Sequence, residues 1–505
     1  MRRFKMACVV TLLFSGWANA QTQTFVKQIA HSSHIQLAEC IRTENNDFVL
    51  LQVAAAGLGA GQSEIVVTKL SSNADLIWSR TYGTGTFDQS GNIEKTRDGG
   101  FIITGSTIVN NPVFQGLVLK LDSTGNIEWS KSYESDYNND LAIDIAELPN
   151  GDLMLLFNTD TPSILKLDAT GNLIWARQYF SSQESISPIS MKSANDGSVV
   201  LNTYRPGQLE GKTYLISIDT SGAVLWSKSY LATSSHLILD QTRTQSGNWM
   251  LFGPPGVLFT TDSMGNLLSA NRYDSLGYIF SATALDSNQF FLSGSSASVP
   301  PKSVVMKIDR LGTPLQTMVY SPTAYNVAQQ AYSLKDTSRL IFGTENQFMS
   351  GLTRSVLIMK TDSAGFTGCE DTSISSGLTN WPLIVQSETI LTNQLNSITV
   401  TPLTFQTGAS PGLTQVCPPT NVDGIKLDET AFRLYPNPTT GMLHLESVNT
   451  INTITIYNSF GQTILSQHIN TKEASFNLNS QPSGLYFYRL NTTTGTQHIG
   501  RIVLQ

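Results

Sequence analysis

The hydrophobic and polar residues of this chain follow a pattern that returns about every fifty residues. Residues 120–133 are Lys-Leu-Asp-Ser-Thr-Gly-Asn-Ile-Glu-Trp-Ser-Lys-Ser-Tyr, and residues 166–179 and 217–230 are close copies. In each copy an apolar strand ends in Asp-x-x-Gly, and an alternating apolar and polar strand follows. Looser copies place the Asp at 262, 309 and 362, and a first copy has Ser71 in its place. The pattern predicts seven equivalent units.

A second repeated stretch, a polar turn followed by an apolar strand, lies before each of these. Asp98–Thr107 is its clearest copy and residues 150–157 are another, with counterparts that begin near residues 46, 196, 246, 287 and 337. Together the stretches give four predicted strands in every unit of 43 to 53 residues. Seven units of four strands predict an all-β fold, a seven-bladed β-propeller.

The last unit lacks the alternating strand that should complete it. The missing pattern, aromatic-x-Lys-x-apolar, occurs instead at Phe25–Ile29. We therefore expect this N-terminal segment to add to the last blade, which closes the ring and covers an exposed edge.

The Asp-x-x-Gly turns are predicted to be structural. The Asp side chain can accept hydrogen bonds from backbone amides of the turn, and Gly permits the positive φ that reverses the chain. One carboxylate per turn is too few for a calcium loop. The turn residues are Asp122, Gly125, Asp168, Gly171, Asp219, Gly222, Asp262, Gly265, Asp309, Gly312, Asp362 and Gly365. The following Trp78, Trp129, Trp175 and Trp226 are expected to pack between blades.

The order Asp-x-Thr-Gly-x-x-x-Trp at residues 122–129 and 168–175 resembles the docking motif of quinoprotein-type propellers. That group includes enzymes and non-enzymatic scaffolds. Its quinone enzymes have adjacent cysteines over the cofactor, and this chain has no Cys-Cys pair. The resemblance implies the propeller fold without that chemistry, and we expect no cofactor.

The N-terminus has the pattern of a secretory signal peptide over residues 1–20. Arg2, Arg3 and Lys5 precede an apolar stretch, and Ala18-Asn19-Ala20 is a small-x-small cleavage site. No later stretch has the 18 or more continuous apolar residues of a membrane helix. The sequence therefore predicts an exported chain without a transmembrane segment.

Export exposes the remaining cysteines, Cys40, Cys369 and Cys417, to oxidising conditions. Cys369 and Cys417 flank the same Ser/Thr-rich segment, so we predict a disulfide between them and a buried, unpaired Cys40 within a strand. No Cys/His spacing indicates zinc, and His31 and His34 are not expected to bind metal.

The repeats occupy residues 21–367. Residues 368–428 are expected to form a disulfide-stapled, β-containing connector that ends in a linker near Pro418. Residues 429–505 then show alternating strands between Pro-Asn, Phe-Gly and Ser-Gly turns, which predicts a small Ig-like β-sandwich.

The same C-terminal residues resemble the type A sorting domain of proteins that Bacteroidota export through the type IX secretion system. The residues that match are Tyr435, Pro436, Asn437, Pro438, Gly441, Gly461, Gly484, Tyr486 and Arg501, where Arg501 replaces the usual Lys. The resemblance implies recognition by the outer-membrane translocon and secretion or attachment to the cell surface. An ordinary adhesive sandwich is the alternative.

The composition excludes one class of partner. With 31 basic and 38 acidic residues the formal charge is −7, so no basic field attracts nucleic acid. Phosphate loops, nucleophile elbows and zinc-protease motifs are absent from the sequence. The densest acidic cluster, Glu134, Asp136, Asp140 and Asp144, is interpreted as a solvated rim rather than a catalytic pair.

Two classes of function remain, and a third is weaker. The first is a secreted or surface binding module for a glycan or protein, with no catalytic residue assigned. The second is an exported hydrolase or lyase that acts on polysaccharide. Convergent carboxylates in the central channel would favour the enzyme, and a channel without them would favour binding. A periplasmic assembly scaffold is the third.

Overall fold

The computed structural model describes residues 24–505 except 31–33, 56–57, 59–60, 109–112, 138, 160, 195, 207–210, 233–237, 324, 347–353, 370, 396, 409–410, 418–431, 459–462 and 494–496. The signal-peptide residues 1–20 lie outside the described part. The chain forms two compact units, residues 1–419 and 420–505. No helix long and apolar enough to cross a bilayer occurs in the ranges above.

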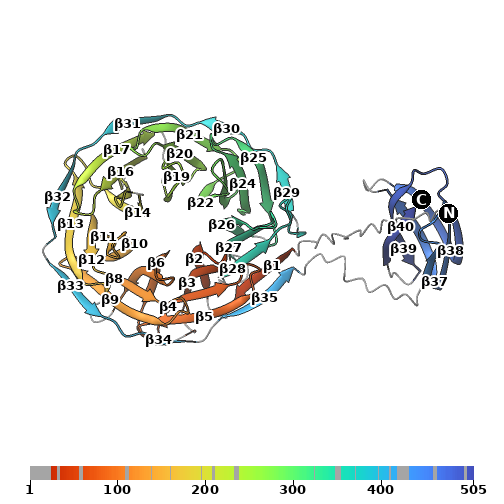
Figure 1. Ribbon diagram of the computed structural model, residues 1–505, viewed down its shortest axis with the longest axis horizontal. Coiled ribbons are helices and arrows are strands. Elements are labelled where there is room, and N and C mark those ends of the chain that lie inside the picture. The colour runs from red at the N-terminus through yellow and green to blue at the C-terminus, as the bar shows by residue number, and fades with distance from the viewer. Residues whose placement is uncertain are drawn as a thin grey trace, which may run out of the picture. The chain divides into compact units, whose positions relative to one another are not determined.

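The first unit is a ring of seven antiparallel sheets, which confirms the predicted seven-bladed β-propeller (Figure 1). Each blade contributes four strands, ordered from the centre outward. Blades 1 and 2 are β2 (Ile35–Arg42), β3 (Phe48–Ala55), β4 (Ser63–Leu70), β5 (Leu76–Gly83) and β6 (Asp88–Lys95), β7 (Phe101–Thr107), β8 (Gln115–Leu121), β9 (Ile127–Ser135). Blades 3 and 4 are β10 (Leu141–Glu147), β11 (Leu153–Asn158), β12 (Pro162–Leu167), β13 (Leu173–Ser181) and β14 (Ser187–Ser193), β15 (Val199–Tyr204), β16 (Lys212–Ile218), β17 (Val224–Ala232).

The remaining blades follow the same order. Blades 5 and 6 are β18 (Asp240–Arg243), β19 (Trp249–Gly253), β20 (Val257–Thr261), β21 (Leu267–Tyr273) and β22 (Tyr278–Ala284), β23 (Gln289–Ser295), β24 (Ser303–Asp309), β25 (Pro314–Tyr320). Blade 7 is β26 (Asn326–Ser333), β27 (Arg339–Asn346), β28 (Arg354–Lys360) and β1 (Phe25–Ala30). β1 pairs antiparallel with β28, with Phe25 opposite Lys360, so the expected closure by the N-terminal segment is confirmed.

The segment after blade 7 forms a fifth strand in every sheet. Its strands are β29 (Asp371–Ile374), β30 (Leu378–Asn380), β31 (Leu383–Ser387), β32 (Ile390–Gln394), β33 (Ile398–Pro402), β34 (Gln406–Thr407) and β35 (Gly412–Cys417). They pair in turn with the outermost strands of blades 6, 5, 4, 3, 2, 1 and 7. The chain thus makes a complete circuit of the ring, opposite in direction to the blades (Figure 1). We call residues 371–417 the belt.

The belt corrects the expected domain boundary. We predicted a separate connector from residue 368, but residues up to 419 belong to the compact unit of the propeller. The physical reason is that the outer strand of each blade has an unpaired edge, which the belt covers with backbone hydrogen bonds. Belt residues repeat one contact: the amides of Trp381, Glu388, Leu395 and Leu403 donate to the carbonyls of Ala270, Ser227, Ala176 and Ser130 in blades 5, 4, 3 and 2.

The cysteines lie at informative places in this circuit. Cys40 is buried in β2 with a free thiol, and Cys369, directly before the belt, takes part in a disulfide. Cys417 ends the belt, where its backbone lies opposite Val26, and Val26 belongs to the same apolar cluster as Cys369. The side chain of Cys417 is outside the described part, so the Cys369–Cys417 pairing stays a prediction.

The repeated Asp-x-x-Gly turns hold neighbouring blades together. In six of them an Asp Oδ1 accepts hydrogen bonds from two turn amides, and Ser71 Oγ does the same in the first blade. Hydrogen bonds from Thr124 and Asn126 outweigh burial and lower the pKa of Asp122 well below its ordinary value. The carbonyl of each turn glycine accepts the hydroxyl of a buried Tyr from the preceding blade, as Tyr133 does to Gly171 at 2.7 Å. The equivalent donors to Gly125, Gly222, Gly265, Gly312 and Gly365 are Tyr82, Tyr179, Tyr230, Tyr273 and Tyr320.

Blade 7 has no Tyr at this position, and a lysine replaces the contact. Lys27 of β1 donates from Nζ to the carbonyl of Ala74 at 3.0 Å and to Asp75 Oδ1 at 3.1 Å. The ring therefore closes through the same position of the turn, with a different donor.

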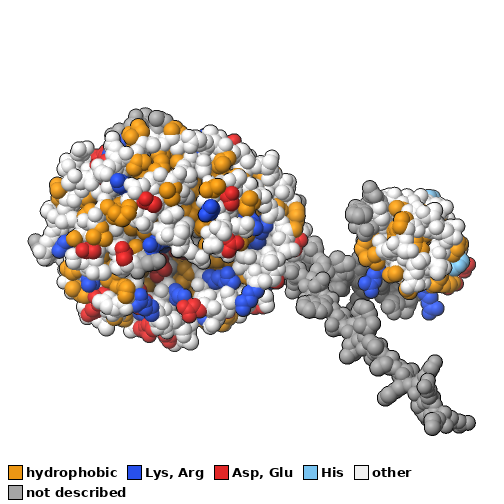
Figure 2. All heavy atoms as spheres, turned by 45° about the horizontal axis from the view of Figure 1, so that its top comes forward, with side chains coloured by type: hydrophobic (Ala, Val, Ile, Leu, Met, Phe, Trp, Pro, Cys, Tyr) orange, Lys and Arg blue, Asp and Glu red, His pale blue; other side chains and the backbone are white. Residues whose placement is uncertain are grey.

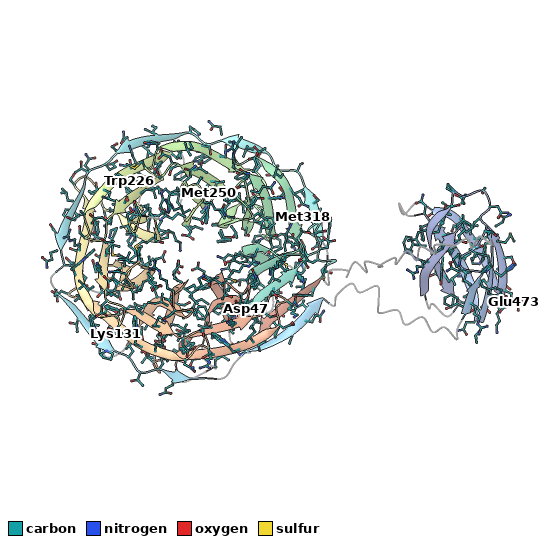
Figure 3. All side chains as sticks on the ribbon, in the orientation of Figure 1. Asp47, Lys131, Trp226, Met250, Met318 and Glu473 are labelled. Atoms are coloured by element: carbon teal, nitrogen blue, oxygen red, sulfur yellow. The ribbon has the colours of Figure 1, made fainter. Side chains whose placement is uncertain are left out.

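Each of the four repeat tryptophans, Trp78, Trp129, Trp175 and Trp226, packs on the turn glycine of the next blade. A Cβ built on Gly171 would lie 2.7 Å from Cζ3 and 2.8 Å from Cη2 of Trp129. The glycine is thus needed both for its φ of +78° and for the indole above it. Figure 3 labels Lys131 on β9 and Trp226 on β17, two strands toward the outside of the ring.

Gly171→Ala should destabilise the propeller by about 3 kcal/mol, because left-handed backbone strain of about 1–2 kcal/mol adds to overpacking against Trp129. Gly151→Ala is the matched control, since its φ is +87° but no atom lies within 4 Å of the added Cβ. That control should lose only the backbone part, about 1 kcal/mol. Urea unfolding of both variants measures the difference, and equal losses would contradict the role of the indole.

The second unit is a β-domain of five strands: β36 (Phe432–Tyr435), β37 (Met442–Tyr457), β38 (Thr463–Asn477), β39 (Gly484–Thr492) and β40 (Gln497–Leu504). β37 pairs with β36 in its first half and with β39 in its second half, while β38 pairs along both. Register shifts after Glu446 bend the long strands, so the two halves enclose an apolar core that includes Leu443, Ile454, Phe476 and Leu490.

Candidate functional site: the central channel

The inner strands of all seven blades surround a cavity of about 380 Å³. They are β2, β6, β10, β14, β18, β22 and β26. Figure 1 labels all of these except β18 around the centre of the ring. Figure 2 shows one face of the propeller, on which acidic and basic side chains lie close together near the middle. A cavity of this size is in the range of small-ligand sites.

Bulges in the inner strands shape the lining of this cavity. Six of the seven inner strands have a register shift against the second strand of the blade, and in β18 none occurs. A bulge leaves its extra residue unpaired and re-aims the neighbouring side chains. The bulge residues that line the cavity are Ala38, Gly91, Asn92, Ile143, Ile189, Phe280 and Gln329, with Leu239 at the entry of β18.

One polar residue occupies an equivalent position in every blade. In β2, β10, β14, β22 and β26 it directly follows the bulge, in β6 it is the second bulge residue, and in β18 it is the first residue of the strand. They are Glu39, Asn92, Asp144, Ser190, Asp240, Ser281 and Gln330, in blade order. Six of them line the cavity, and Ser281 directly follows the lining residue Phe280. We call these seven residues the polar ring.

Three carboxylates of the polar ring come from blades 1, 3 and 5. Their charge is opposed by Lys192 of β14, whose Nζ lies 3.6 Å from Asp144 Oδ2 and 3.2 Å from Glu94 Oε1. Glu39 and Asp240 have no ion pair within the described ranges. Among the described residues three carboxylates therefore line the channel, and Lys192 and Glu94 form an ion pair beside it.

Burial and the neighbouring charges raise the pKa of two polar-ring residues. Burial raises the pKa of Glu39 to about 8, against the attraction of Lys192, and the neighbouring Glu94, Asp240 and Asp144 raise it further. Burial likewise raises the pKa of Asp144 to about 7, although Lys192 and the amide of Met191 oppose the shift. Near neutral pH the channel therefore contains protonated carboxyl groups.

Several polar atoms of the ring are buried without a hydrogen-bond partner among the described residues. They are Asn92 Oδ1, Ser190 Oγ, Asp240 Oδ1 and Ser281 Oγ. Ser190 is 5% exposed and Ser281 is 7% exposed. An unsatisfied buried polar group costs about 1–3 kcal/mol, so a ligand that supplies donors would be favoured here.

The acidic cluster identified in the sequence divides between two environments. Asp136 is exposed, but Asp140 and Asp144 are buried, so the solvated-rim interpretation is wrong for these two. Asp140 Oδ1 accepts the hydroxyl of Ser135 at 2.7 Å and stabilises a turn, while Asp144 faces the channel. Asp140 precedes β10, whereas Asp144 lies within this strand, directly after the bulge at Ile143.

The two histidines that were not expected to bind metal, His31 and His34, are described only in part. His31 lies outside the described part, and His34 Nδ1 accepts the amide of Arg354 at 3.3 Å. No group of three or more potential metal ligands occurs in the ranges that the structure describes.

The polar ring was missed at the sequence level, although a signal for it exists. Each ring residue lies six positions before a turn residue, at 45, 98, 150, 196, 246, 287 or 336, which precedes the second strand of its blade. Aligning the units on that turn would have shown a polar side chain at this position in all seven, despite their different identities.

In the C-terminal domain three sorting-motif residues, Asn437, Gly484 and Tyr486, contact the last strand, β40. Asn437 Nδ2 donates to the carbonyl of Arg501 at 2.8 Å, and Asn437 Oδ1 accepts the amide of Val503 at 2.9 Å. Tyr435, half of whose surface is covered, donates to Glu446 Oε1 at 2.6 Å, and Tyr486 donates to the carbonyl of Pro482 at 2.6 Å. Pro436 and Pro438 flank Asn437, Gly441 has a φ of +135°, Gly484 begins β39, and Gly461 lies outside the described residues.

A hollow of about 700 Å³ lies beside Asn437. It is lined by Phe432, Arg433, Leu434, Tyr435, Asn437, Glu446 and Tyr488. Four of these seven lining residues belong to β36. The motif therefore fixes the terminal strand against the start of the domain.

Comparison with known proteins supports this assignment of the C-terminal domain. Residues 433–505 match the family described as a secretion system C-terminal sorting domain. The chain is a cargo of the type IX secretion system with a propeller region, and it is exported to the cell surface or secreted. No curated protein matches the chain.

Solved structures similar to the chain include a protein of unknown function from Bacteroides caccae, at 12% identity and a TM-score of 0.37 over 54% of this chain and 93% of that one. Another is PorZ of Porphyromonas gingivalis, described as an essential surface component of the type IX secretion system, at 10% identity and a TM-score of 0.35 over 93% of this chain and 75% of that one. The WD40 repeats of RRP9 match at 10% identity and a TM-score of 0.40 over 66% of this chain and 97% of that one.

Proposed function

We propose that this exported propeller binds an extracellular ligand, a glycan or a protein, through its central channel. The observation that supports the proposal is the polar ring, because six of its seven polar residues line one cavity although the blades share little sequence there. Four of these residues keep a buried polar atom without a partner in the described structure. Such atoms reduce stability unless something binds them.

The ring is the part of the scaffold best suited to recognition. Its side chains stand on the innermost strands, each of which pairs with the second strand of its blade, so the lining is preorganised and little ordering cost opposes binding. The domain at residues 433–505 interacts with the secretion system. The propeller is therefore the unit free to bind a ligand outside the cell, which argues against a periplasmic scaffold.

A second candidate is acid–base catalysis on polysaccharide. One observation favours it: the carboxylates of Glu39, Asp144 and Asp240 converge on the cavity. Glu39, with a pKa of about 8, can serve as an acid near neutral pH, and an ionised partner can serve as a base. Convergent carboxylates in the channel were the feature expected of the enzyme.

One experiment tests the binding function and separates it from catalysis. The full chain and the variant Glu39→Gln/Asp144→Asn are incubated with a panel of bacterial glycans and basic and acidic peptides, and the thermal midpoint and the products are measured. Binding predicts a ligand that raises the midpoint of the wild type and not of the variant, with the ligand recovered intact. Recovery of shortened glycan from the wild type alone would replace binding with hydrolysis or elimination. Midpoint shifts of equal size in both proteins would overturn the channel as the site.

A further inference from the structure

We propose that the channel recognises an organic cation, an ammonium or guanidinium group on an alkyl chain, held by the carboxylates of Glu39, Asp144 and Asp240. This inference rests on the proposed binding function and adds the chemical class of the ligand. It follows from the charges, the unpartnered acceptors and the apolar residues of the same cavity.

The charged side chains around the channel are mostly acidic. Four carboxylates approach the channel from blades 1, 2, 3 and 5, and Lys192 pairs with those of Glu94 and Asp144. Glu39 and Asp240 are left without a cationic partner among the described side chains. A ligand with a positive group would supply counter-charge to them, and an anionic ligand would meet repulsion in a site of low dielectric.

The unpartnered atoms define the hydrogen-bonding side of the ligand. Asn92 Oδ1 and Asp240 Oδ1 accept hydrogen bonds only, and Ser190 Oγ, on a residue 5% exposed, can accept as well. An ammonium group offers three donors and a guanidinium five, with no acceptor. A cationic group can therefore donate to those acceptors that lie within its reach.

The apolar lining defines the rest of the ligand. Ile143, Ile189, Leu239 and Phe280 line the same cavity as the carboxylates. An alkyl chain can pack on these side chains while its charged end reaches the polar ring. An amino sugar fits less well, because its hydroxyl groups would be placed against Ile and Leu.

A bare metal ion is disfavoured by the spread of the carboxylates. Divalent calcium needs six to eight oxygen ligands at about 2.3–2.6 Å, and the described residues contain no group of three or more potential ligands. The carboxylates come from alternate blades, so they are not gathered around one point as a metal ion requires.

The acidity of the channel gives the proposal a second, independent signature. Between about pH 6 and 9 the carboxyls of Glu39 and Asp144 lose their protons. Glu94, Lys192 and Asp240 are the charged groups that face them. Because a cation binds the ionised carboxylates, it competes with protons, so its affinity should rise with pH and its binding should release protons.

The test is calorimetric titration of the full chain with agmatine and n-hexylamine, beside 1-hexanol, glucosamine and methyl glucoside as probes of the alternatives. We expect both amines to bind at least about tenfold more tightly at pH 8.5 than at pH 6, with proton release in buffers of different ionisation enthalpy. Glu39→Gln should weaken binding about tenfold or more. Glu473→Gln, at an exposed position of the C-terminal domain with the same change of charge, should not.

The outcomes separate the inference from the function on which it rests. Channel-dependent binding of methyl glucoside without the amines would overturn the cation and leave the binding function intact. Binding of glucosamine alone would replace the alkyl cation with an amino sugar. Failure of every probe, or amine binding that Glu39→Gln leaves unchanged, would overturn the inference. Glu39→Gln changes the charge of the side chain and hardly its size. A thermal melt of each variant checks that it is folded.

Discussion

A chain that ends at Gly368 should lose more than about 5 kcal/mol of stability and aggregate, because it lacks the belt. The belt forms the outer edge of all seven sheets, and each inter-strand hydrogen bond contributes about 1 kcal/mol net. The loss is comparable with the whole stability of many domains. Without the belt, seven unpaired strand edges face solvent and can pair with other chains.

The matched control is a chain that ends at Pro419, which keeps the belt and lacks the C-terminal domain. Size-exclusion chromatography, dye binding and thermal melts of the two chains should show a stable monomer only for the longer one. A monomeric, native-like chain ending at Gly368 would mean that the belt covers edges that are already stable.

Lys192→Met should destabilise the propeller by about 3 kcal/mol at pH 8 and by less than about 1 kcal/mol at pH 5. At pH 8 the substitution removes the counter-charge of Asp144, whose side chain is 2% exposed, and an uncompensated buried charge costs about 3–5 kcal/mol. At pH 5 the carboxyl of Asp144, with a pKa of about 7, is already protonated, so little is lost.

The sign follows from proton linkage. A carboxyl whose folded pKa is raised binds a proton in the folded state while the unfolded state has released it, so stability falls as the pH rises from about 4 to 8. Removing Lys192 strengthens this fall. Denaturant unfolding at both pH values measures it.

Lys95→Met, which removes the partner of the largely exposed Glu44, is the control and should change stability by less than about 1 kcal/mol at either pH. A Lys192→Met loss that is independent of pH would show that the lysine acts by packing alone.

The sequence predicted the blades because their information is local. Each unit has its own turn, its own apolar strands and its own Asp-x-x-Gly reversal, so a repeat of about fifty residues was enough to count seven blades. Even the closure by Phe25–Ile29 could be found, since that segment has the aromatic-x-Lys-x-apolar pattern of the strand it replaces.

The belt could not be predicted in the same way. Its strands are two to six residues long, and each finds its partner far away in the chain, as Gln406 does opposite Gly83. Its contact repeat, from Trp381 to Glu388, Leu395 and Leu403, uses backbone amides, which any residue can supply. The belt strands therefore leave little periodic pattern of apolar and polar side chains in the sequence.

The polar ring of the channel could be predicted from the sequence less well than the blades and better than the belt. Its residues are set by position and not by identity: Glu, Asn, Asp, Ser, Asp, Ser and Gln occupy equivalent places. Asp144 was noticed, but as one of four nearby acidic residues. Its neighbours in space, Glu39 and Asp240, are about a hundred residues away in either direction.

The belt also determines how the propeller responds to a mechanical pull at its C-terminal side. Tension that enters the chain after Cys417 loads β35 first, and the remaining belt strands follow in reverse order. The sheets are thus loaded one after another, and the resisting force is that of a single short strand pair at a time. A bond between Cys369 and Cys417 would carry the tension past the belt to the end of blade 7, so that one covalent link would decide whether a pull unwinds the outer layer or leaves it in place.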